Sequence, residues 1–235
     1  MTNQAAESEN SMAGRSVLIA GATGGLGSAI ARNLADRGAS LTLVSRNQQR
    51  LDALDVPGHR VALDLRDPAM CAAAIQAAVD HAGRLDAVIN AVGVVAFGPI
   101  EQLSVDAMEE LFLVNTFIPI LLAKSALGQL GEGGVIVNIS GVIAEQNLPG
   151  MAAYGASKAA ARSFDTALSR EARRQKVRVI DARPPHTETG LAERPVEGES
   201  PRMPSGLEPA AVAATICDAI AGDATDLPST AFVSG

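Results

Sequence analysis

Short apolar runs alternate with segments of helical periodicity along most of the chain. The first run, residues 16–20, leads into a glycine-rich turn and then into an amphipathic segment that Gly38 ends. This order repeats several times. The pattern predicts strands at residues 16–20, 41–44, 60–63, 87–90, 135–139, 177–181 and 230–233. It predicts helices at residues 25–37, 48–54, 68–81, 105–127, 154–174 and 209–220.

The predicted strands are apolar throughout rather than alternating between apolar and polar residues. Such strands are typical of a parallel sheet that helices cover on both faces, and the sequence therefore predicts an α/β, doubly wound fold. No repeat, charge block or linker divides residues 14–182, so residues 14–235 are expected to form a single domain. Residues 1–13 are expected to be a flexible tail, and residues 190–207, rich in proline and glycine, a surface loop or lid.

Composition narrows the class of partner. Of the 235 residues, 47% are hydrophobic and 19% are charged, which suits a globular domain with a large core. The net charge of −7 repels phosphate backbones and acidic lipids, so we expect a small-molecule partner, no nucleic acid and no membrane. The longest apolar stretch, residues 111–123, is interrupted by polar residues and is shorter than the roughly 20 residues that a membrane span needs.

Cysteine and histidine usage predicts neither disulfides nor a metal site. Cys71 and Cys217 lie far apart in sequence and outside any CxxC motif, which indicates two reduced thiols and a cytoplasmic location. His59, His81 and His186 are isolated, without the spacing of metal ligands.

A glycine-rich turn, Gly21–Gly27, joins the first strand to the first helix. Glycines there would let the backbone approach a phosphate, and the helix dipole would favour its negative charge. A purely structural tight turn is the alternative, but the position directly after the first strand favours a dinucleotide pyrophosphate. The sequence therefore predicts a Rossmann-type sheet.

The segment after the second strand bears on the choice of cofactor. It carries Ser45 and Arg46 and no acidic residue. An acidic residue there usually binds the ribose hydroxyls of NAD, whereas an arginine accommodates the 2′-phosphate of NADP. We therefore expect NADP(H), with NAD(H) as the other possibility, although Arg46 could simply be a solvated loop residue. Asp64 could accept a hydrogen bond from adenine or could cap the next turn.

Tyr154 and Lys158 are four residues apart at the start of a predicted helix and so share one face. An ammonium and an oxidised nicotinamide beside the phenol would favour phenolate and lower its pKa from about 10. Tyr154 could then exchange a proton with a substrate hydroxyl or carbonyl. It is the only tyrosine in the chain.

Taken together, these motifs resemble the short-chain dehydrogenase/reductase family, in its single-domain branch. The turn is similar to the family's TGxxxGxG, with Ala20 in place of the threonine, and residues 154–158 match YxASK. Residues 89–93 resemble its NNAG segment, with Ala91 in place of the second asparagine. Residues 184–189 resemble PGxxxT, with Pro185 in place of the glycine.

The resemblance implies a role for each matching residue. Tyr154 would be the acid/base, Lys158 would hold the nicotinamide ribose, and Asn115 would hold a proton-relay water. The predicted cofactor-binding residues are Gly21, Thr23, Gly24, Gly25, Leu26, Gly27, Ser45, Arg46, Asp64, Leu65, Asn90, Ala91, Gly93, Tyr154, Lys158, Pro184, Thr187 and Thr189. The predicted catalytic residues are Tyr154, Lys158, Asn115 and Ser140.

Ser140 is included because the chain departs from the family's pattern. The substrate-polarising serine usually lies thirteen residues before the tyrosine, and that position is Gly141. A one-residue shift turns a strand side chain to the opposite face, although a bulge could return Ser140 to the site. Both outcomes are open at the level of sequence.

The predicted function is interconversion of a secondary alcohol and a ketone by hydride transfer. The residues expected around the substrate are mostly apolar, which suggests an apolar molecule, although each is also a good core residue: Val94, Val95, Phe97, Val142, Ile143, Leu148 and Leu191. The helices that carry Asn115 and Tyr154 resemble those that pair in the family, so we expect a homodimer or homotetramer. A weakly catalytic or non-catalytic nucleotide-binding sensor or scaffold is the alternative, motivated by Gly141.

Overall fold

The computed structural model describes residues 12–232. Its strands are β1 (Ser16–Ala20), β2 (Ser40–Ser45), β3 (His59–Ala62), β4 (Leu85–Asn90), β5 (Leu130–Ile139) and β6 (Arg178–Ala182). Its α-helices are α2 (Gly25–Asp36), α3 (Gln48–Asp52), α4 (Pro68–Ala82), α5 (Val105–Phe112), α6 (Ile118–Leu127), α7 (Ala152–Ala172) and α8 (Pro209–Ala221). A π-helical turn, η2 (Leu113–Phe117), joins α5 to α6. The 3₁₀ turns are η1 (Ile100–Gln102), η3 (Val142–Ala144), η4 (Arg173–Gln175) and η5 (Ser229–Phe232).

The six strands form one parallel sheet in the order β3-β2-β1-β4-β5-β6. The order reverses between β1 and β4, which is where a doubly wound sheet opens a crevice for a ligand. In the pairing register Asn90 lies beside Ala20 and Asn138, and Asn138 lies beside Asp181. The prediction of a doubly wound parallel sheet is confirmed.

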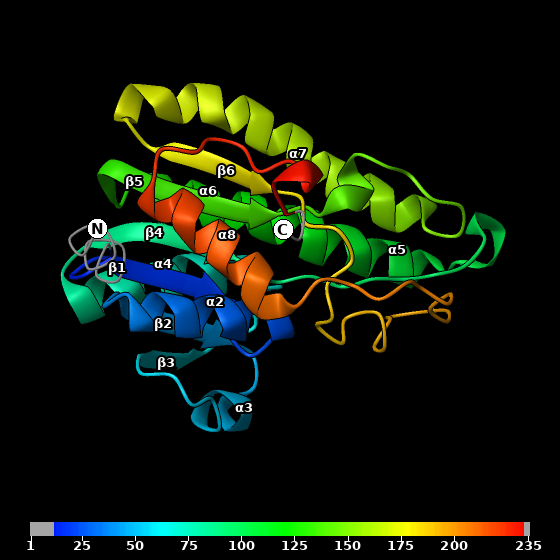
Figure 1. Ribbon diagram of the computed structural model, residues 1–235, viewed down its shortest axis with the longest axis horizontal. Helices are drawn as coiled ribbons and strands as arrows, with labels where there is room; N and C mark the ends of the chain where they lie inside the picture. The colour runs from blue at the N-terminus through cyan, green and yellow to red at the C-terminus, as the bar shows by residue number, and fades with distance from the viewer. Residues whose placement is uncertain (1–11, 233–235) are drawn as a thin grey trace, which may run out of the picture.

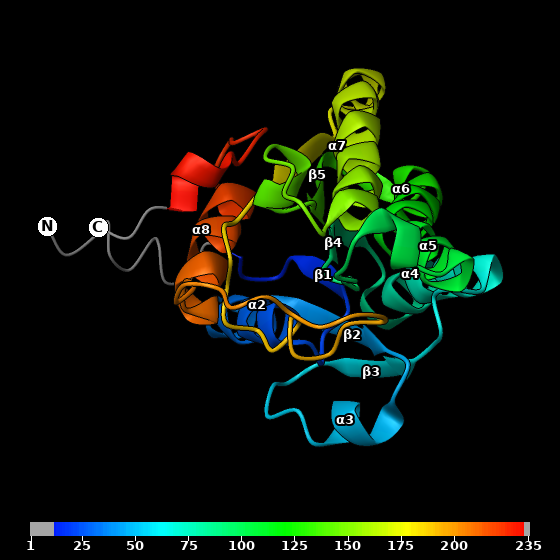
Figure 2. The ribbon, with the colours of Figure 1, turned by 90° about the vertical axis from the view of Figure 1, so that its right-hand side faces the viewer.

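Helices cover both faces of the sheet (Figures 1 and 2). Helices α2 and α8 pack together on one face, over a core that includes Ile19, Ile89 and Val137. Helices α4, α6 and α7 cover the other face, over Leu18 and Val88 among others. The short helix α3 lies beside β3 at the edge of the sheet. Because apolar side chains leave the sheet on both sides, every residue of β1 is buried.

Local signals set the helix ends. Asp67 caps α4 by accepting a hydrogen bond from the backbone N–H of Ala69, and Pro68 occupies the first turn. The helix predicted at residues 105–127 is continuous but contains the π-helical turn η2, which the apolar periodicity did not reveal. Such turns add a residue to the helix and are frequent at functional sites.

Two terminal predictions differ from the structure. The predicted tail, residues 1–13, includes Met12, which is fully buried in the core, and residues 1–11 lie outside the described part of the chain. The predicted strand at residues 230–233 is the 3₁₀ turn η5 over the described residues, where Phe232 packs in the core cluster beside α8. Val233 lies outside the described residues.

The helical run Val105–Leu127 is 23 residues long with a mean hydropathy of 1.5, so it has the length and composition of a membrane span. This length exceeds the stretch of residues 111–123 considered from sequence. Half of the apolar window is buried, and α6 packs against α4 and α7 as a core helix would.

Candidate active site

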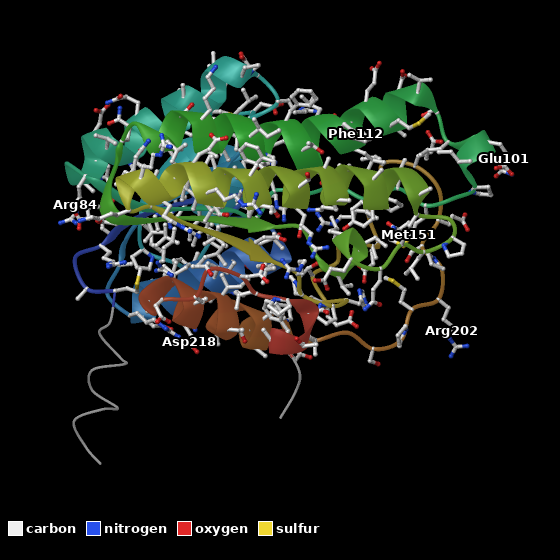
Figure 3. All side chains as sticks on the ribbon, turned by 90° about the horizontal axis from the view of Figure 1, so that it is seen from above. Arg84, Glu101, Phe112, Met151, Arg202 and Asp218 are labelled. Atoms are coloured by element: carbon white, nitrogen blue, oxygen red, sulfur yellow. The ribbon has the colours of Figure 1, made fainter. Side chains whose placement is uncertain are left out.

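A cavity of about 660 Å³ lies at the carboxyl ends of the strands. Figure 3 shows Arg84, which precedes β4, at one end of the molecule and Met151, which lines the cavity, toward the other. The loops after β1, β2, β4, β5 and β6 contribute to the cavity wall, and residues 191–203 contribute to its outer part. The sheet therefore delivers loops from distant parts of the chain to one site.

The glycine turn forms one wall of this cavity. Gly21 has a φ of +81°, and a β-carbon there would lie 2.8 Å from the backbone of Ala91, so only glycine fits this close approach of the two loops. Helix α2 begins at Gly25, and no side chain caps its N-terminus. A cradle of this kind, with the positive end of a helix dipole at the cavity, fits a dinucleotide pyrophosphate.

The loop after β2 carries basic residues into the cavity. Ser45 hydrogen-bonds to Thr23 over 2.8 Å, and Arg50 donates to the carbonyl of Thr23 over 2.8 Å. Arg46 and Arg50 both line the cavity, and neither forms a salt bridge with any carboxylate of residues 12–232. Sequence reasoning missed Arg50, although its position four residues after Arg46 could have suggested that the two act together.

Asp64 is engaged with Arg66. Its carboxylate accepts hydrogen bonds from the Arg66 backbone N–H at 3.2 Å and from Arg66 Nε at 2.9 Å. The Arg66 hydrogen bond holds the pKa of Asp64 below its ordinary value. These contacts agree with the alternative in which Asp64 caps the turn that follows it. Asp64 also lines the cavity.

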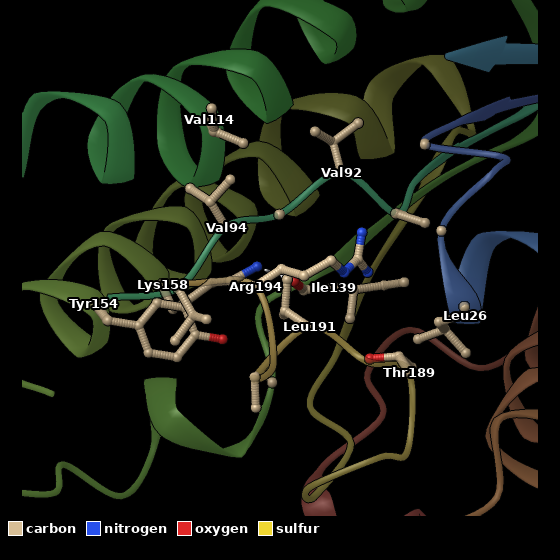
Figure 4. Close-up of a pocket in the computed structure, with 18 of the residues that line it drawn as sticks. Leu26, Val92, Val94, Val114, Ile139, Tyr154, Lys158, Thr189, Leu191 and Arg194 are labelled. Atoms are coloured by element: carbon tan, nitrogen blue, oxygen red, sulfur yellow. Dashed lines mark hydrogen bonds between the residues drawn. The ribbon is translucent and has the colours of Figure 1, made fainter. Parts of the chain in front are cut away.

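Tyr154 and Lys158 lie together at the inner end of the cavity, one turn apart on α7 (Figure 4). Lys158 Nζ donates to the carbonyl oxygen of Ile139 over 2.8 Å, and burial lowers its pKa to about 8. The Tyr154 hydroxyl has no hydrogen-bond partner among residues 12–232, and burial raises its pKa to about 12. The predicted lowering of this pKa is thus not produced by the protein's own residues.

Asn115 lies beneath the site rather than on the cavity wall. It is 1% exposed, and its amide pairs with both backbone groups of Val94, at 3.0 and 2.9 Å. The same amide donates to Ser157 on α7 over 3.0 Å. A β-carbon on Gly93 would lie 3.5 Å from both Asn115 Oδ1 and Lys158 Nζ, so the three residues are close neighbours. Asn115 fastens the loop after β4 to the helix of Tyr154.

Ser140 lines the cavity, and its hydroxyl is engaged with Asp181. The residue is 1% exposed, and its hydroxyl donates to Asp181 Oδ1. A serine has one proton to donate, and in this arrangement Ser140 donates it to Asp181. Strand β5 ends at Ile139, and the N–H groups of Ser140 and Gly141 both donate to the Ala182 carbonyl, at 3.0 and 3.2 Å. Gly141 has a φ of +78° and a ψ of 163°. The role of Ser140 as the substrate-polarising serine stays a prediction.

A buried charge cluster beside Ser140 was missed at the sequence level. Arg183 is 3% exposed and pairs with Asp181 at 2.6 Å, with Asp226 at 2.6 Å, and with Glu145. Its three partners come from three segments of the chain, two of which lie far from Arg183 in sequence, so no local pattern predicted the cluster. Near it, Asn138 donates to Asp165 over 2.6 Å, and burial raises the pKa of Asp165 to about 8.

Residues 190–207 are fastened over the cavity rather than projecting from it. The Val196 N–H donates to the Val95 carbonyl over 2.8 Å, and the Phe97 N–H donates to Glu197 over 3.0 Å. Glu197 also accepts a hydrogen bond from the backbone of Ser104 over 2.8 Å. Backbone pairing therefore joins this loop to the segment after β4. Apolar side chains from both segments line the cavity: Val94, Val95, Phe97, Leu191, Val196 and Met203.

The structure places most of the predicted cofactor residues on the cavity wall. The exceptions are Gly27 and Asn90, which lie behind it. Sequence reasoning missed Arg50, Arg66 and Arg194, which also line the cavity. The rings of His59 and His81, which are far apart in sequence, stack with centroids 4.8 Å apart. No group of three or more candidate metal ligands occurs within residues 12–232.

The fold and site together define a dinucleotide-binding oxidoreductase of Rossmann type. A family model described as short chain dehydrogenase matches residues 15–200. The chain is 31% identical to an uncharacterized oxidoreductase of Methylorubrum extorquens over 71% of its own length and 70% of the relative's. It is 34% identical to a sulfoacetaldehyde reductase of Chromohalobacter salexigens over 74% of its own length and 72% of the relative's.

A solved dehydrogenase/reductase from Sinorhizobium meliloti superposes with a TM-score of 0.85 at 28% identity, covering 97% of this chain and 99% of that one. The chain belongs to the short-chain dehydrogenase family and is an oxidoreductase of that family.

Proposed function

We propose that this protein is an NADP(H)-dependent reductase that converts an apolar ketone to a secondary alcohol, with Tyr154 as the proton donor. The observation that carries the proposal is the Tyr154 hydroxyl, which has no partner in residues 12–232 and lines a dinucleotide-sized cavity beside Lys158. A bound NADPH would supply the hydride. The protein's own residues would supply the proton, the orientation of the substrate and the exclusion of water.

Two arginines support NADP(H) over NAD(H). Arg46 and Arg50 reach the cavity beside Ser45, at the carboxyl end of β2, where the 2′-position of the adenosine ribose binds in this fold. The chain has no acidic residue in the segment 45–50 to bind a free ribose hydroxyl. Two cations and no anion at this position favour a phosphate ester.

The protonation state of Tyr154 is compatible with the proposed proton donation. Burial raises the pKa of Tyr154 to about 12, so the phenol is protonated at neutral pH and can donate a proton to a carbonyl oxygen. Lys158, held by the carbonyl of Ile139, would bind the nicotinamide ribose and favour the phenolate that forms.

The wall near Tyr154 supports an apolar substrate. The side chains that line the cavity near the Tyr154 ring include Val94, Ile143, Leu148, Met151 and Leu191. A cavity with mostly apolar walls and few polar groups is typical of a site for a small organic molecule. No acidic side chain lies on this part of the wall.

The test is the variant Tyr154→Phe, which removes the hydroxyl and keeps the ring. We expect turnover of NADPH with a panel of aromatic and aliphatic ketones, followed by absorbance of the reduced cofactor, to fall at least 100-fold, because the proton donor contributes about 10²–10⁴-fold. NADPH affinity, measured by fluorescence titration, should stay within a factor of three of wild type. Turnover equal to wild type would refute the role of Tyr154.

A nucleotide-binding sensor of the same fold is the second candidate function. The observation that favours it is the absence of a hydroxyl at Gly141 together with the engagement of Ser140 by Asp181. A sensor would bind NADPH in the same titration and turn over none of the ketones. An enzyme would do both, so the two measurements separate the candidates.

We further propose a cytoplasmic homo-oligomer. Both cysteines are buried and free, as expected in a reducing compartment. Phe117 is 55% exposed and Val105 64% exposed along the run of α5 and η2, and a second copy of the chain would cover them.

A further inference from the structure

The cavity contains one cation that neither the adenosine end nor the proton chemistry uses. Arg194, from the lid segment 190–207, lines the cavity wall. In the view of Figure 4 the Arg194 side chain overlaps Lys158 and Ile139, and its guanidinium lies with Tyr154 on one side and Leu26 and Thr189 on the other.

Two contacts place this guanidinium beside Gly190, which follows a residue packed on the start of α2. Arg194 Nε donates to the carbonyl of Gly190 over 3.0 Å, and a β-carbon on Gly190 would lie 3.9 Å from a terminal nitrogen of Arg194. The preceding residue, Thr189, lies against the first residue of α2, because a β-carbon on Gly25 would be 2.7 Å from Thr189 Cα. Arg194 therefore folds back toward the glycine turn.

The charge of Arg194 is not balanced by the protein. It forms no salt bridge with any carboxylate in the described range 12–232, including Glu193 on the same turn. Nε is the one donor of its side chain with a protein acceptor there, which leaves the terminal nitrogens free for a ligand. Arg194 is exposed, so these nitrogens are accessible to a ligand that enters the cavity.

We infer that Arg194 is a cofactor-binding residue that closes on the diphosphate of the dinucleotide from the lid side. The inference rests on the proposed function, since it requires NADP(H) in this cavity. Backbone N–H groups of the glycine turn would contact the diphosphate from one side, and the planar guanidinium would contact it from the other. An anionic substrate is the other ligand that Arg194 could bind, but the wall near Tyr154 is apolar and does not favour one.

The inference makes the lid part of the cofactor site. Val196 and Glu197 pair with the backbone of Val95 and Phe97, so the segment carrying Arg194 is already joined to the loop after β4. A diphosphate held by Arg194 would add an ionic contact to this pairing. Cofactor binding and lid closure would then stabilise each other.

The experiment measures dissociation constants of NADP⁺ and of 2′-AMP by calorimetry for wild type, Arg194→Ala, Arg194→Lys and Arg202→Ala. The control Arg202→Ala removes the same charge from the same loop, and Arg202 points away from the cavity (Figure 3). We expect Arg194→Ala to weaken NADP⁺ binding about 10- to 100-fold, the value of a charge-assisted hydrogen bond, and Arg194→Lys to recover part of the loss. Arg202→Ala should change nothing.

The fragment 2′-AMP carries the 2′-phosphate and no diphosphate, so its affinity should be the same in all four proteins. An unchanged NADP⁺ affinity in Arg194→Ala overturns the inference, and a raised ketone KM in that variant would then assign Arg194 to the substrate. A wild-type protein that binds neither NADP⁺ nor NAD⁺ overturns the proposed function itself, which is a different result.

Discussion

Replacing Gly141 with serine would restore the side chain that the family usually has, but we expect it to destabilise the protein. The backbone there has a φ of +78° and a ψ of 163°, a conformation that is nearly restricted to glycine. Space is not the obstacle, since the nearest heavy atom to an added β-carbon is the Pro184 carbonyl oxygen at 3.8 Å. The cost is backbone strain of about 1–3 kcal/mol.

In a chain of this size, that strain corresponds to a melting temperature lowered by about 2–12 °C. Thermal unfolding and urea titration of Gly141→Ser and Gly141→Ala measure it directly. Both variants should lose the same stability to within about 0.5 kcal/mol, because the hydroxyl adds no contact. A Gly141→Ser protein as stable as wild type would refute the argument, since the loop would then accept a side chain without strain.

Three further predictions concern other residues. Arg50→Ala should weaken NADPH binding about tenfold or more and leave NADH binding unchanged, because a charge-assisted contact to the 2′-phosphate is lost. Arg84→Ala, far from the cavity, is the control. Equal losses of affinity for both cofactors would contradict the prediction. Burial raises the pKa of Asp165 from 3.8 to about 8, so the folded protein keeps a proton that the unfolded chain loses, and stability from this group falls as pH rises between those values. Urea unfolding at pH 5 and pH 8 should therefore show a smaller loss in Asp165→Asn than in wild type, and identical losses would refute the assignment. Phe117→Arg should lower the oligomeric state in size-exclusion chromatography, because the exposed ring would lie in the interface. An unchanged elution volume would refute this.

The parts of the molecule that could be predicted from sequence are those that local patterns determine. The apolar runs identified every strand of the sheet, and the glycine turn lies where its position after the first strand suggested. Tyr154 and Lys158 could be paired because a four-residue spacing on a helix fixes their relation whatever the rest of the fold does.

Features assembled from distant segments could not be predicted in this way. The three segments that supply the partners of Arg183 meet only after the sheet and its last loop have formed. Arg194 reaches the cavity because a loop folds back across it, and loop paths have no periodic signal. The pairing of Ser140 with Asp181 depends on which face of the sheet the Ser140 side chain occupies beside β6, and the sequence left both faces open.

The buried position of Met12 has a practical consequence for anyone who shortens or tags the chain. A variant that starts at residue 13 would remove a side chain that fills the interior beside α2, and the hole left behind would cost about 2–5 kcal/mol. Cleavage sites and fusion partners therefore belong on the amino-terminal side of Met12, so that its buried side chain stays with the domain.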